Sequence, residues 1–120
     1  MQYMMMFYEN EAELAKRESA TEAGAYWGAW NAYIGAIYEA GIVVKGDGLL
    51  PPAAATTVRL ANGERQVQDG PVAASKEQLG GYFVIEVPDL DTALFWAARS
   101  PNASAGATEL RPVLPPPSQT

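Results

Sequence analysis

The sequence of 120 residues contains no cysteine and no histidine. The absence of cysteine excludes a disulfide framework, a thiolate nucleophile and every metal site that needs a thiolate ligand. The absence of histidine removes the side chain that most often acts as a general base near neutral pH. Acid–base chemistry would therefore fall to carboxylates, tyrosines or lysines, and we expect neither a metal nor a cofactor.

Positive charge is also scarce. Eight Lys and Arg stand against 14 Asp and Glu, which gives a net charge of −6, and the basic residues form no cluster. Nucleic acid is therefore not an expected partner. With 48% hydrophobic and 18% charged residues, the composition is typical of a globular chain. We expect one domain over residues 1–114 and a flexible, proline-rich tail over residues 115–120.

The apolar run at residues 1–8 (MQYMMMFY) has no basic segment before it and no small-residue cleavage site after it. It is also too short to cross a membrane. We therefore expect a cytoplasmic protein with no membrane contact. A nearly continuous apolar run is typical of a strand that is covered on both faces, so residues 1–8 are predicted to form a central strand.

An aromatic stripe predicts the longest helix, at about residues 22–40. Its members recur at helical spacing, and they are Tyr26, Trp27, Trp30, Tyr33, Ile34, Ile37 and Tyr38. We expect Thr21 or a neighbour to cap its start and Gly41 to end it in the left-handed conformation. The stripe should mostly enter the core, although a tyrosine hydroxyl at its edge could line a pocket. Residues 9–21 are expected to form an irregular link or a short solvated helix.

The other elements follow from shorter patterns. We predict a strand at 42–47, a hairpin at 56–68, a strand at 79–87, a helix from the Asp89 cap to about Arg99, and a strand at 108–114. Asn62-Gly63 lies between the two arms of the hairpin, and both residues accept the positive φ of a type I′ turn.

This order predicts an α+β fold, namely a ferredoxin-like βαββαβ sandwich with an inserted β-hairpin and an antiparallel sheet. Both long helices would cover one face of the sheet. The other face would keep apolar residues from 1–8 and 82–87, a patch that is too large for a stable monomer. We therefore predict a homodimer that pairs the sheet faces, as in a dimeric α+β barrel.

Several motifs occur in order along nearly the whole chain, and they are specific as a set. They are Thr57-Val58-Arg59, Asn62-Gly63, Asp69-Gly70-Pro71, SKEQLGGY at 75–82, VPDLD at 87–91, WAAR at 96–99 and Arg111-Pro112-Val113. With them the chain resembles the DGPF-domain branch of the YCII-related proteins, whose subunits form dimeric α+β barrels. The chain departs from that pattern at Val72, where Phe is usual, and at Ala74, where an acidic residue is usual.

The resemblance also bears on function. More distant YCII relatives carry a His and Asp pair proposed as acid and base, and these positions would fall near Trp30 and Ser100 here. Since the chain has no histidine, that pair cannot operate. The resemblance further implies a bacterial protein and an association with sigma-factor-type regulators, without a general biochemical role for the branch.

Asp69 and Glu77 are the candidate catalytic residues, because carboxylates remain available for proton transfer. Asp69 precedes Gly-Pro, so its side chain could instead bond nearby backbone N–H groups and hold the turn. Glu77 could be solvated or take part in an ion pair.

The candidate ligand-binding residues are Arg59, Lys76, Tyr82 and Arg111. A guanidinium that emerges from a sheet can clamp an anion with two hydrogen bonds. For Arg59 and Arg111 the alternative is an ion pair with Asp69, Glu77 or Glu86.

Other suggestive residues have structural interpretations. Gly80-Gly81 lacks the spacing of a phosphate loop, and it predicts a β-bulge or a close chain approach. Asp89 and Asp91 fit a helix start better than a metal site. Ser75 and Ser100 lack both the strand-turn context and the histidine partner of a hydrolase nucleophile.

Two hypotheses of function remain. The favoured one is a non-catalytic dimeric module that binds a small organic ligand or a partner protein. The alternative is a small-molecule enzyme (a lyase, an isomerase or a dehydrochlorinase-like enzyme) in which Asp69 or Glu77 moves a proton on a substrate held by Arg59 or Arg111. A cavity beside Asp69 would favour the enzyme.

Overall fold

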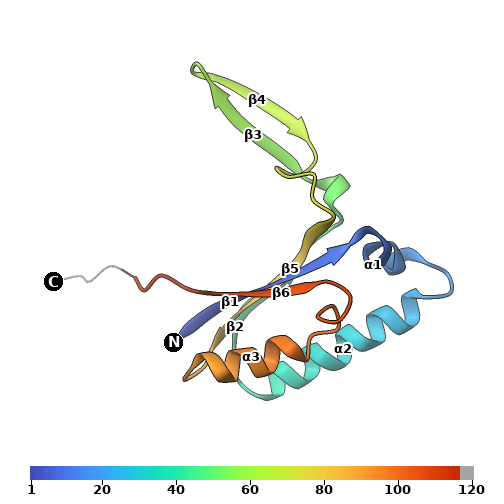
Figure 1. Ribbon diagram of the computed structural model, residues 1–120, viewed down its shortest axis with the longest axis vertical. Helices are drawn as coiled ribbons and strands as arrows, with labels where there is room; N and C mark the ends of the chain where they lie inside the picture. The colour runs from blue at the N-terminus through green and yellow to red at the C-terminus, as the bar shows by residue number, and fades with distance from the viewer. Residues whose placement is uncertain (117–120) are drawn as a thin grey trace.

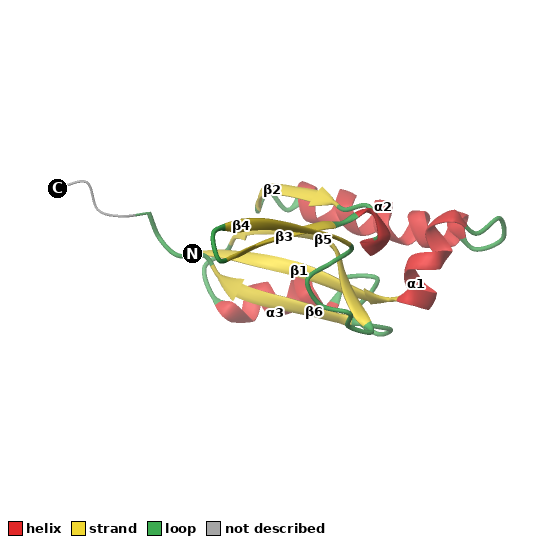
Figure 2. Ribbon diagram, turned by 90° about the horizontal axis from the view of Figure 1, so that it is seen from above, coloured by secondary structure: helices red, strands yellow, loops and turns green. Residues whose placement is uncertain are grey.

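The computed structural model describes residues 1–116, and the last four residues of the predicted tail, 117–120, lie outside that range. Its elements are β1 (Gln2–Asn10), α1 (Glu11–Ala15), the 3₁₀ helix η1 (Lys16–Glu18), α2 (Ala23–Glu39), β2 (Val43–Gly48), the 3₁₀ helix η2 (Pro52–Ala54), β3 (Thr56–Ala61), β4 (Glu64–Asp69), β5 (Glu77–Glu86), α3 (Leu90–Ala98) and β6 (Ala107–Pro112). Figures 1 and 2 show their arrangement.

The main sheet has four antiparallel strands in the order β2-β5-β1-β6. This is the ferredoxin-like βαββαβ order, with the β3–β4 hairpin inserted between its halves, so the predicted fold class is confirmed. As predicted, β1 is a central strand, and its Met5 lies opposite Phe83 of β5 and Leu110 of β6.

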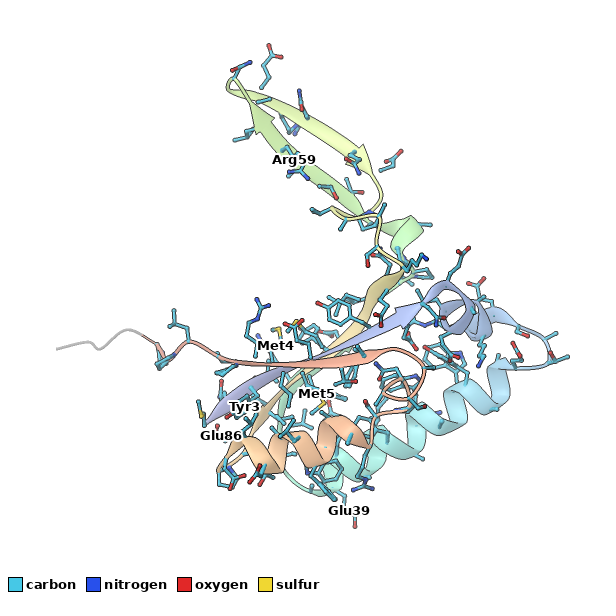
Figure 3. All side chains as sticks on the ribbon, viewed as in Figure 1. Tyr3, Met4, Met5, Glu39, Arg59 and Glu86 are labelled. Atoms are coloured by element: carbon cyan, nitrogen blue, oxygen red, sulfur yellow. The ribbon has the colours of Figure 1, made fainter. Side chains whose placement is uncertain are left out.

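The core lies between this sheet and the two longer helices, which cover the same face (Figure 1). Because side chains alternate along a strand, β1 sends Tyr3, Met5 and Phe7 into the core and turns Met4 to the other side (Figure 3). Met5 and Ile85 of β5 are fully buried beneath Ile37 of α2. No helix within residues 1–116 is long and apolar enough to span a membrane.

The aromatic stripe of α2 divides into two parts. Tyr26, Trp30, Tyr33 and Ile37 are buried at spacings of four, three and four, which is the inward-facing pattern of a helix on a sheet. Trp27 and Tyr38, by contrast, are 42% and 52% exposed. The prediction that the stripe mostly enters the core therefore holds for its centre, whereas its outer edge faces the rim of the sheet.

Two of the three predicted helix ends are confirmed. The Asp89 carboxylate accepts a hydrogen bond from the Thr92 backbone N–H at 2.8 Å at the start of α3. Gly41 takes a φ of 72° after α2. At the start of α2 the sequence predicts a cap at Thr21 or a neighbour; Thr21 does not cap the helix, and the neighbouring Ser19 hydroxyl accepts hydrogen bonds from the backbone N–H groups of Thr21 and Glu22 in the turn before it.

The hairpin of β3 and β4 extends away from the body of the chain (Figure 1). Its turn carries Asn62 at φ 53° and Gly63 at φ 78°, as predicted for a type I′ turn. At its base the Thr57 hydroxyl donates to the Gly70 carbonyl at 2.7 Å, and the Gly70 N–H donates to the Ala55 carbonyl at 2.7 Å. These bonds hold the turn, and the structure records no such role for the Asp69 side chain.

Candidate ligand-binding cavity

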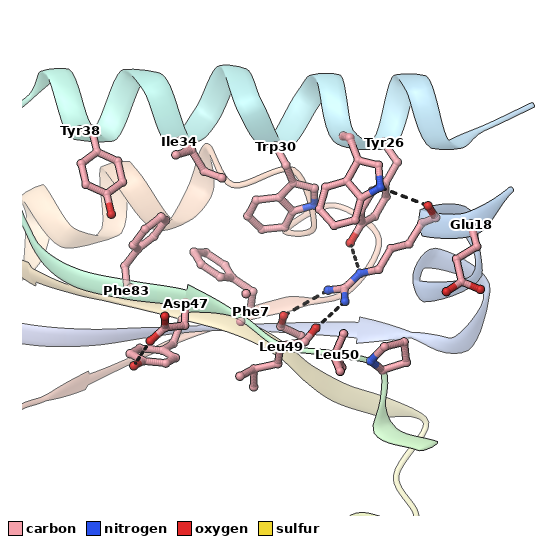
Figure 4. A pocket seen from close by; sticks show the side chains of 18 residues that line it. Phe7, Glu18, Tyr26, Trp30, Ile34, Tyr38, Asp47, Leu49, Leu50 and Phe83 are labelled. Carbon is pink, nitrogen blue, oxygen red and sulfur yellow. Dashed lines mark hydrogen bonds between the residues drawn. The ribbon is translucent and has the colours of Figure 1, made fainter. Parts of the chain in front are cut away.

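A cavity of about 660 Å³ lies between α2 and the β2–β5 side of the sheet (Figure 4). Its wall is mainly aromatic and apolar, with four glycines and three charged residues. The aromatic residues are Phe7, Tyr26, Trp27, Trp30, Tyr38, Tyr82 and Phe83; the others are Ile34, Leu49, Leu50, Pro51, Gly46, Gly48, Gly80, Gly81, Arg17, Glu18 and Asp47. The outer edge of the α2 stripe therefore forms one side of a cavity.

Glycines let the strands form the opposite wall. A Cβ atom on Gly46 would collide with the ring of Phe83, so glycine at this position leaves space for an aromatic ring beside the edge strand. Gly80 is the extra residue where the pairing moves from Phe7–Gly81 to Tyr8–Leu79, which confirms the predicted bulge. A Cβ on Gly80 would lie 2.6 Å from a carboxylate oxygen of Glu9.

A buried polar cluster closes one end of the cavity. Glu9 is the second-last residue of β1, and only 1% of it is exposed. It accepts a hydrogen bond from the Tyr26 hydroxyl at 2.7 Å and forms an ion pair with Arg17 at 3.2 Å. Both carboxylate oxygens are therefore engaged, which offsets the cost of burying the charge.

Arg17 ties four parts of the chain together. Its Nε donates to the Tyr26 hydroxyl at 3.0 Å, and its Nη2 donates to Glu9 and to the Gly80 carbonyl, the latter at 3.1 Å. Its Nη1 donates to the Leu49 carbonyl at 2.6 Å. A guanidinium has five N–H groups, and these bonds use four of them. The second N–H on Nη1 therefore has no partner among residues 1–116. Arg17 is also one of the residues that line the cavity.

Aromatic rings hold the guanidinium from the α2 side. The Arg17 guanidinium lies 5.9 Å from the ring centre of Tyr26 and 5.6 Å from that of Trp27. The Trp27 indole N–H also donates to the Arg17 carbonyl at 3.1 Å. Trp27 therefore joins the end of η1 to the exposed edge of α2, although 42% of it remains open to solvent.

Tyr26 is held as a neutral phenol. Burial, followed by its hydrogen bond to Glu9, raises the pKa of Tyr26 from 10.0 to about 12, while the Arg17 guanidinium acts in the opposite direction. Near neutral pH this hydroxyl is therefore a hydrogen-bond donor to Glu9 rather than a general base.

Asp47 and Tyr82 form a second polar pair on β2 and β5, where both residues border the cavity and their side chains point to the side of the sheet opposite to Phe83. They lie opposite each other on β2 and β5, and the Tyr82 hydroxyl donates to the Asp47 carboxylate at 2.7 Å. This bond raises the pKa of Tyr82.

Of the six site residues predicted from the sequence, only Tyr82 is among the cavity lining. Arg59 is exposed on the hairpin, Asp69 is exposed at the end of β4, and Glu77 is exposed at the start of β5. The structure does not gather them around one cavity, and the roles proposed for them remain predictions.

The two remaining predicted residues are also exposed. Lys76 precedes β5, and Arg111 of β6 pairs with Glu109 at 2.8 Å rather than with the partners considered from the sequence. Glu86, one of those partners, instead pairs with the N-terminal amine of Met1 at 3.0 Å.

Glu9 and Arg17 are not among the site residues predicted from the sequence, because both lie in the segment 9–21 that is predicted to be an irregular link or a short solvated helix. A signal for Glu9 was present, because it follows Tyr3, Met5 and Phe7 at a spacing of two and therefore points to the buried face. A carboxylate at such a position requires a buried partner. The sequence contains no comparable signal for Arg17.

Comparisons with known proteins agree on the fold. The sequence model of the YCII-related domain matches residues 1–116. An uncharacterised protein of Rhizobium meliloti (strain 1021) is 46% identical over 67 residues, and this match spans about half of each protein, 54% in both cases. A solved 5-chloro-2-hydroxyhydroquinone dehydrochlorinase from Burkholderia phenoliruptrix AC1100, in complex with 2,5-dihydroxybenzoquinone, has a TM-score of 0.57 and 14% identity, covering 95% of this chain and 94% of that one.

The raised pKa of Tyr26 predicts a loss of stability in alkali. An unfolded tyrosine loses its proton near about pH 10, whereas the folded chain keeps Tyr26 protonated to about pH 12. The unfolded state then binds fewer protons, so the free energy of unfolding should fall as pH rises from about 10 to about 12. Urea unfolding across this range should show the fall, and Tyr26→Phe should make it shallower.

Near neutral pH, Tyr26→Phe should lower the free energy of unfolding by about 1–3 kcal/mol, because a buried carboxylate oxygen loses its donor. Titration of the tyrosines by absorbance gives a second readout. The absorbance change at high pH should be smaller in the variant than in the wild type, by about the contribution of one tyrosine. An unchanged late titration in Tyr26→Phe would contradict the assignment of the raised pKa to this residue.

Proposed function

The chain belongs to the YCII-related family, and from this premise we propose that it binds a small planar organic molecule with oxygen substituents in the cavity beside α2. The observation that carries the proposal is an aromatic cavity that contains one fixed guanidinium with a spare N–H group. Small-molecule sites are typically apolar and aromatic concavities with a few convergent polar groups.

The size and lining of the cavity indicate the ligand class. A volume of about 660 Å³ lies within the roughly 300–1,000 Å³ of ordinary ligand sites. Trp27 and Tyr38 on α2 and Phe83 on β5 offer ring faces and edges, against which a planar ring packs favourably. A one- or two-ring compound suits such walls better than a flexible aliphatic chain.

Arg17 indicates the polar end of the ligand. Its unpartnered N–H can donate to a carbonyl, phenolate or carboxylate oxygen, and the bonds to Glu9, Gly80 and Leu49 already fix its position. A fixed donor loses little conformational entropy when it binds. Because Glu9 neutralises the guanidinium, the site should accept a neutral or a singly charged oxygen.

Binding is favoured over catalysis by the state of the polar groups. The Glu9 carboxylate is engaged on both oxygens, and burial keeps Tyr26 protonated. The dehydrochlorinase with the same fold was solved with a quinone, which is a planar ring with oxygen substituents. That likeness is at the level of the fold and supports the ligand class by analogy.

The binding proposal predicts a specific effect at Trp27. Isothermal titration calorimetry with 2,5-dihydroxybenzoquinone should detect binding to the wild type. Trp27→Ala should weaken it about tenfold, because the ligand loses an aromatic contact and buried area.

Phe95→Ala is the matched control. Phe95 is also an exposed helical aromatic, and the Arg99 guanidinium lies 5.3 Å from its ring centre, but it is outside the cavity lining. Binding by this variant should equal that of the wild type. Equal losses in the two variants, or no binding by a folded wild type, would contradict the cavity as the binding site for this ligand class.

A second candidate is an enzyme that uses Asp47. Asp47 borders the cavity, and within residues 1–116 its carboxylate accepts one hydrogen bond, from Tyr82. An available oxygen could remove a proton from a ring hydroxyl. Among the carboxylates considered for catalysis, Asp47 is therefore better placed than Asp69 or Glu77.

The enzyme candidate predicts release of chloride from 5-chloro-2-hydroxyhydroquinone. This compound appears in the name of the dehydrochlorinase that shares the fold. Asp47→Asn should lower that rate by about a hundredfold, the typical contribution of one general base. Asp91→Asn, an exposed change on α3, should leave it unchanged. No chloride release above the spontaneous rate would rule out this activity and would leave the binding proposal intact.

Within the family we propose the DGPF-domain branch. The support is the ordered set of motifs from Thr57 to Val113, of which Asp69-Gly70-Pro71 is the most distinctive. Gly70 adopts a φ of 103°, a conformation that favours glycine, at the base of the hairpin. The motif therefore has a structural use in this chain.

We also propose that the chain forms a homodimer through its sheet faces. The sheet side away from the helices carries Met4, Met6 and Tyr8 of β1 beside Tyr82 and Val84 of β5, called the open face below. No helix covers it within residues 1–116 (Figure 1). An apolar sheet face of this kind is normally buried against a second layer.

Light scattering coupled to size-exclusion chromatography tests the dimer. The expected mass is twice the 12.8 kDa of the chain. Met6→Lys should shift the equilibrium toward monomer, because it places a charge in the interface. Glu39→Lys at the exposed end of α2, on the helix side of the sheet, serves as the control. A wild-type mass equal to that of one chain at micromolar concentration would contradict the dimer.

A further inference from the structure

We infer that two copies of the chain exchange their hairpins, so that the β3–β4 hairpin of each copy (the arm, residues 56–69) packs on the open face of the other. This inference rests on the homodimer proposed above and adds which segments meet. The arm and the open face are both partly apolar, and both lack a partner layer within residues 1–116.

The arm has little to stabilise it within one chain. An isolated two-stranded hairpin is marginally stable in water. Val58 and Val67 lie opposite each other across the arm, and by alternation Leu60 shares their face. These side chains are 59%, 59% and 76% exposed. Three large apolar side chains on one face of a protruding hairpin indicate a surface that is buried in the assembled protein.

The shape of the chain leaves room for a second copy. In Figure 1 the arm rises on the side of the sheet opposite the helices, and in Figure 2, seen from above, it overlies the strands of the sheet. The radius of gyration is 16.6 Å, against about 14 Å for a compact chain of this length. The arm therefore stands apart from the body of the chain, on the side of the open face.

The area favours exchange over pairing of the sheets alone. Four strands about 4.8 Å apart, each with about seven residues at about 3.3 Å per residue, give a face of roughly 440 Å². A stable interface needs about 800 Å² from each partner. One face of the arm adds roughly 200 Å² of projected area. Its accessible surface is larger than this, because the side chains protrude from the face. In projected area, the arm therefore enlarges the contact surface of each copy by nearly half.

Symmetry and charge favour a second copy of this chain as the occupant. In a dimer with a two-fold axis, the contact between arm and open face occurs twice. It therefore buries the arm and the open face of each copy. Arg59 and Arg65 balance Glu64 and Asp69 on the arm, so the whole net charge of −6 lies on the rest of the chain. A neutral arm can approach an acidic partner without adding like-charge repulsion.

The first test compares two acidic substitutions on the arm by analytical ultracentrifugation. Val58→Asp lies on the apolar face and should raise the dimer dissociation constant at least about tenfold, because the charge would be buried. Gln66→Asp lies on the opposite face of the same hairpin and should change it less than about threefold, as is usual for surface sites. Equal effects of the two variants would overturn the proposed contact face.

The second test locates the arm directly and leaves the apolar face intact. Because the chain has no cysteine, Gln66→Cys accepts a single spin label. Labelled chains are mixed with unlabelled chains that carry ¹³C-methyl methionine, and the methyl signals are observed by NMR. Broadening of Met4 and Met6 in the unlabelled copy, stronger than that of Met5 on the helix side, would support arm exchange.

The outcomes separate the two proposals. A dimer by light scattering with unbroadened Met4 and Met6 signals would overturn arm exchange and leave the sheet dimer standing. A monomeric wild type would overturn both.

Discussion

The buried ion pair between Glu9 and Arg17 is the interaction on which the rest of the site depends. It connects the end of β1 to the bulge at Gly80 and to the carbonyl of Leu49, where the chain leaves β2 toward the hairpin. Burying two charges is unfavourable unless their hydrogen bonds are nearly complete. Tyr26 completes them by donating to Glu9 and accepting from Arg17. The position of α2 over the sheet is therefore coupled to the closed end of the cavity.

The same pair is the physical basis for proposing recognition rather than proton transfer at this end of the cavity. A carboxylate with both oxygens engaged is a poor base, and a phenol whose pKa is about 12 stays protonated. Within this cluster, one N–H of Arg17 has no partner among residues 1–116, and it lies beside the aromatic outer edge of α2. The groups that stabilise the fold thus leave a fixed hydrogen-bond donor beside Tyr26 and Trp27, which suits the oxygen-bearing ring proposed as ligand.

Local patterns predicted most of the fold, because each element depends on nearby residues. The alternation of β1, the helical spacing of the α2 stripe and the Asn62-Gly63 turn are all signals over a few positions. The cavity could not be predicted in the same way. Arg17 meets Leu49 and Gly80 across 32 and 63 positions, and no short pattern encodes such contacts. The residues chosen from the sequence lie instead mainly on exposed strands and at the base of the hairpin.

The apolar side chains outside the core fall into two kinds, and the difference indicates what each contacts. Trp27 and Tyr38 line a concave surface that also holds a guanidinium and a carboxylate, as a small polar ligand requires. Val58 and Leu60 are exposed on a protruding hairpin, outside the lining of the cavity beside α2. A surface of that kind is covered by another protein layer rather than by a small molecule. On these two proposals the chain carries two separate recognition surfaces, and the junction at Leu49, which accepts a hydrogen bond from Arg17, connects them.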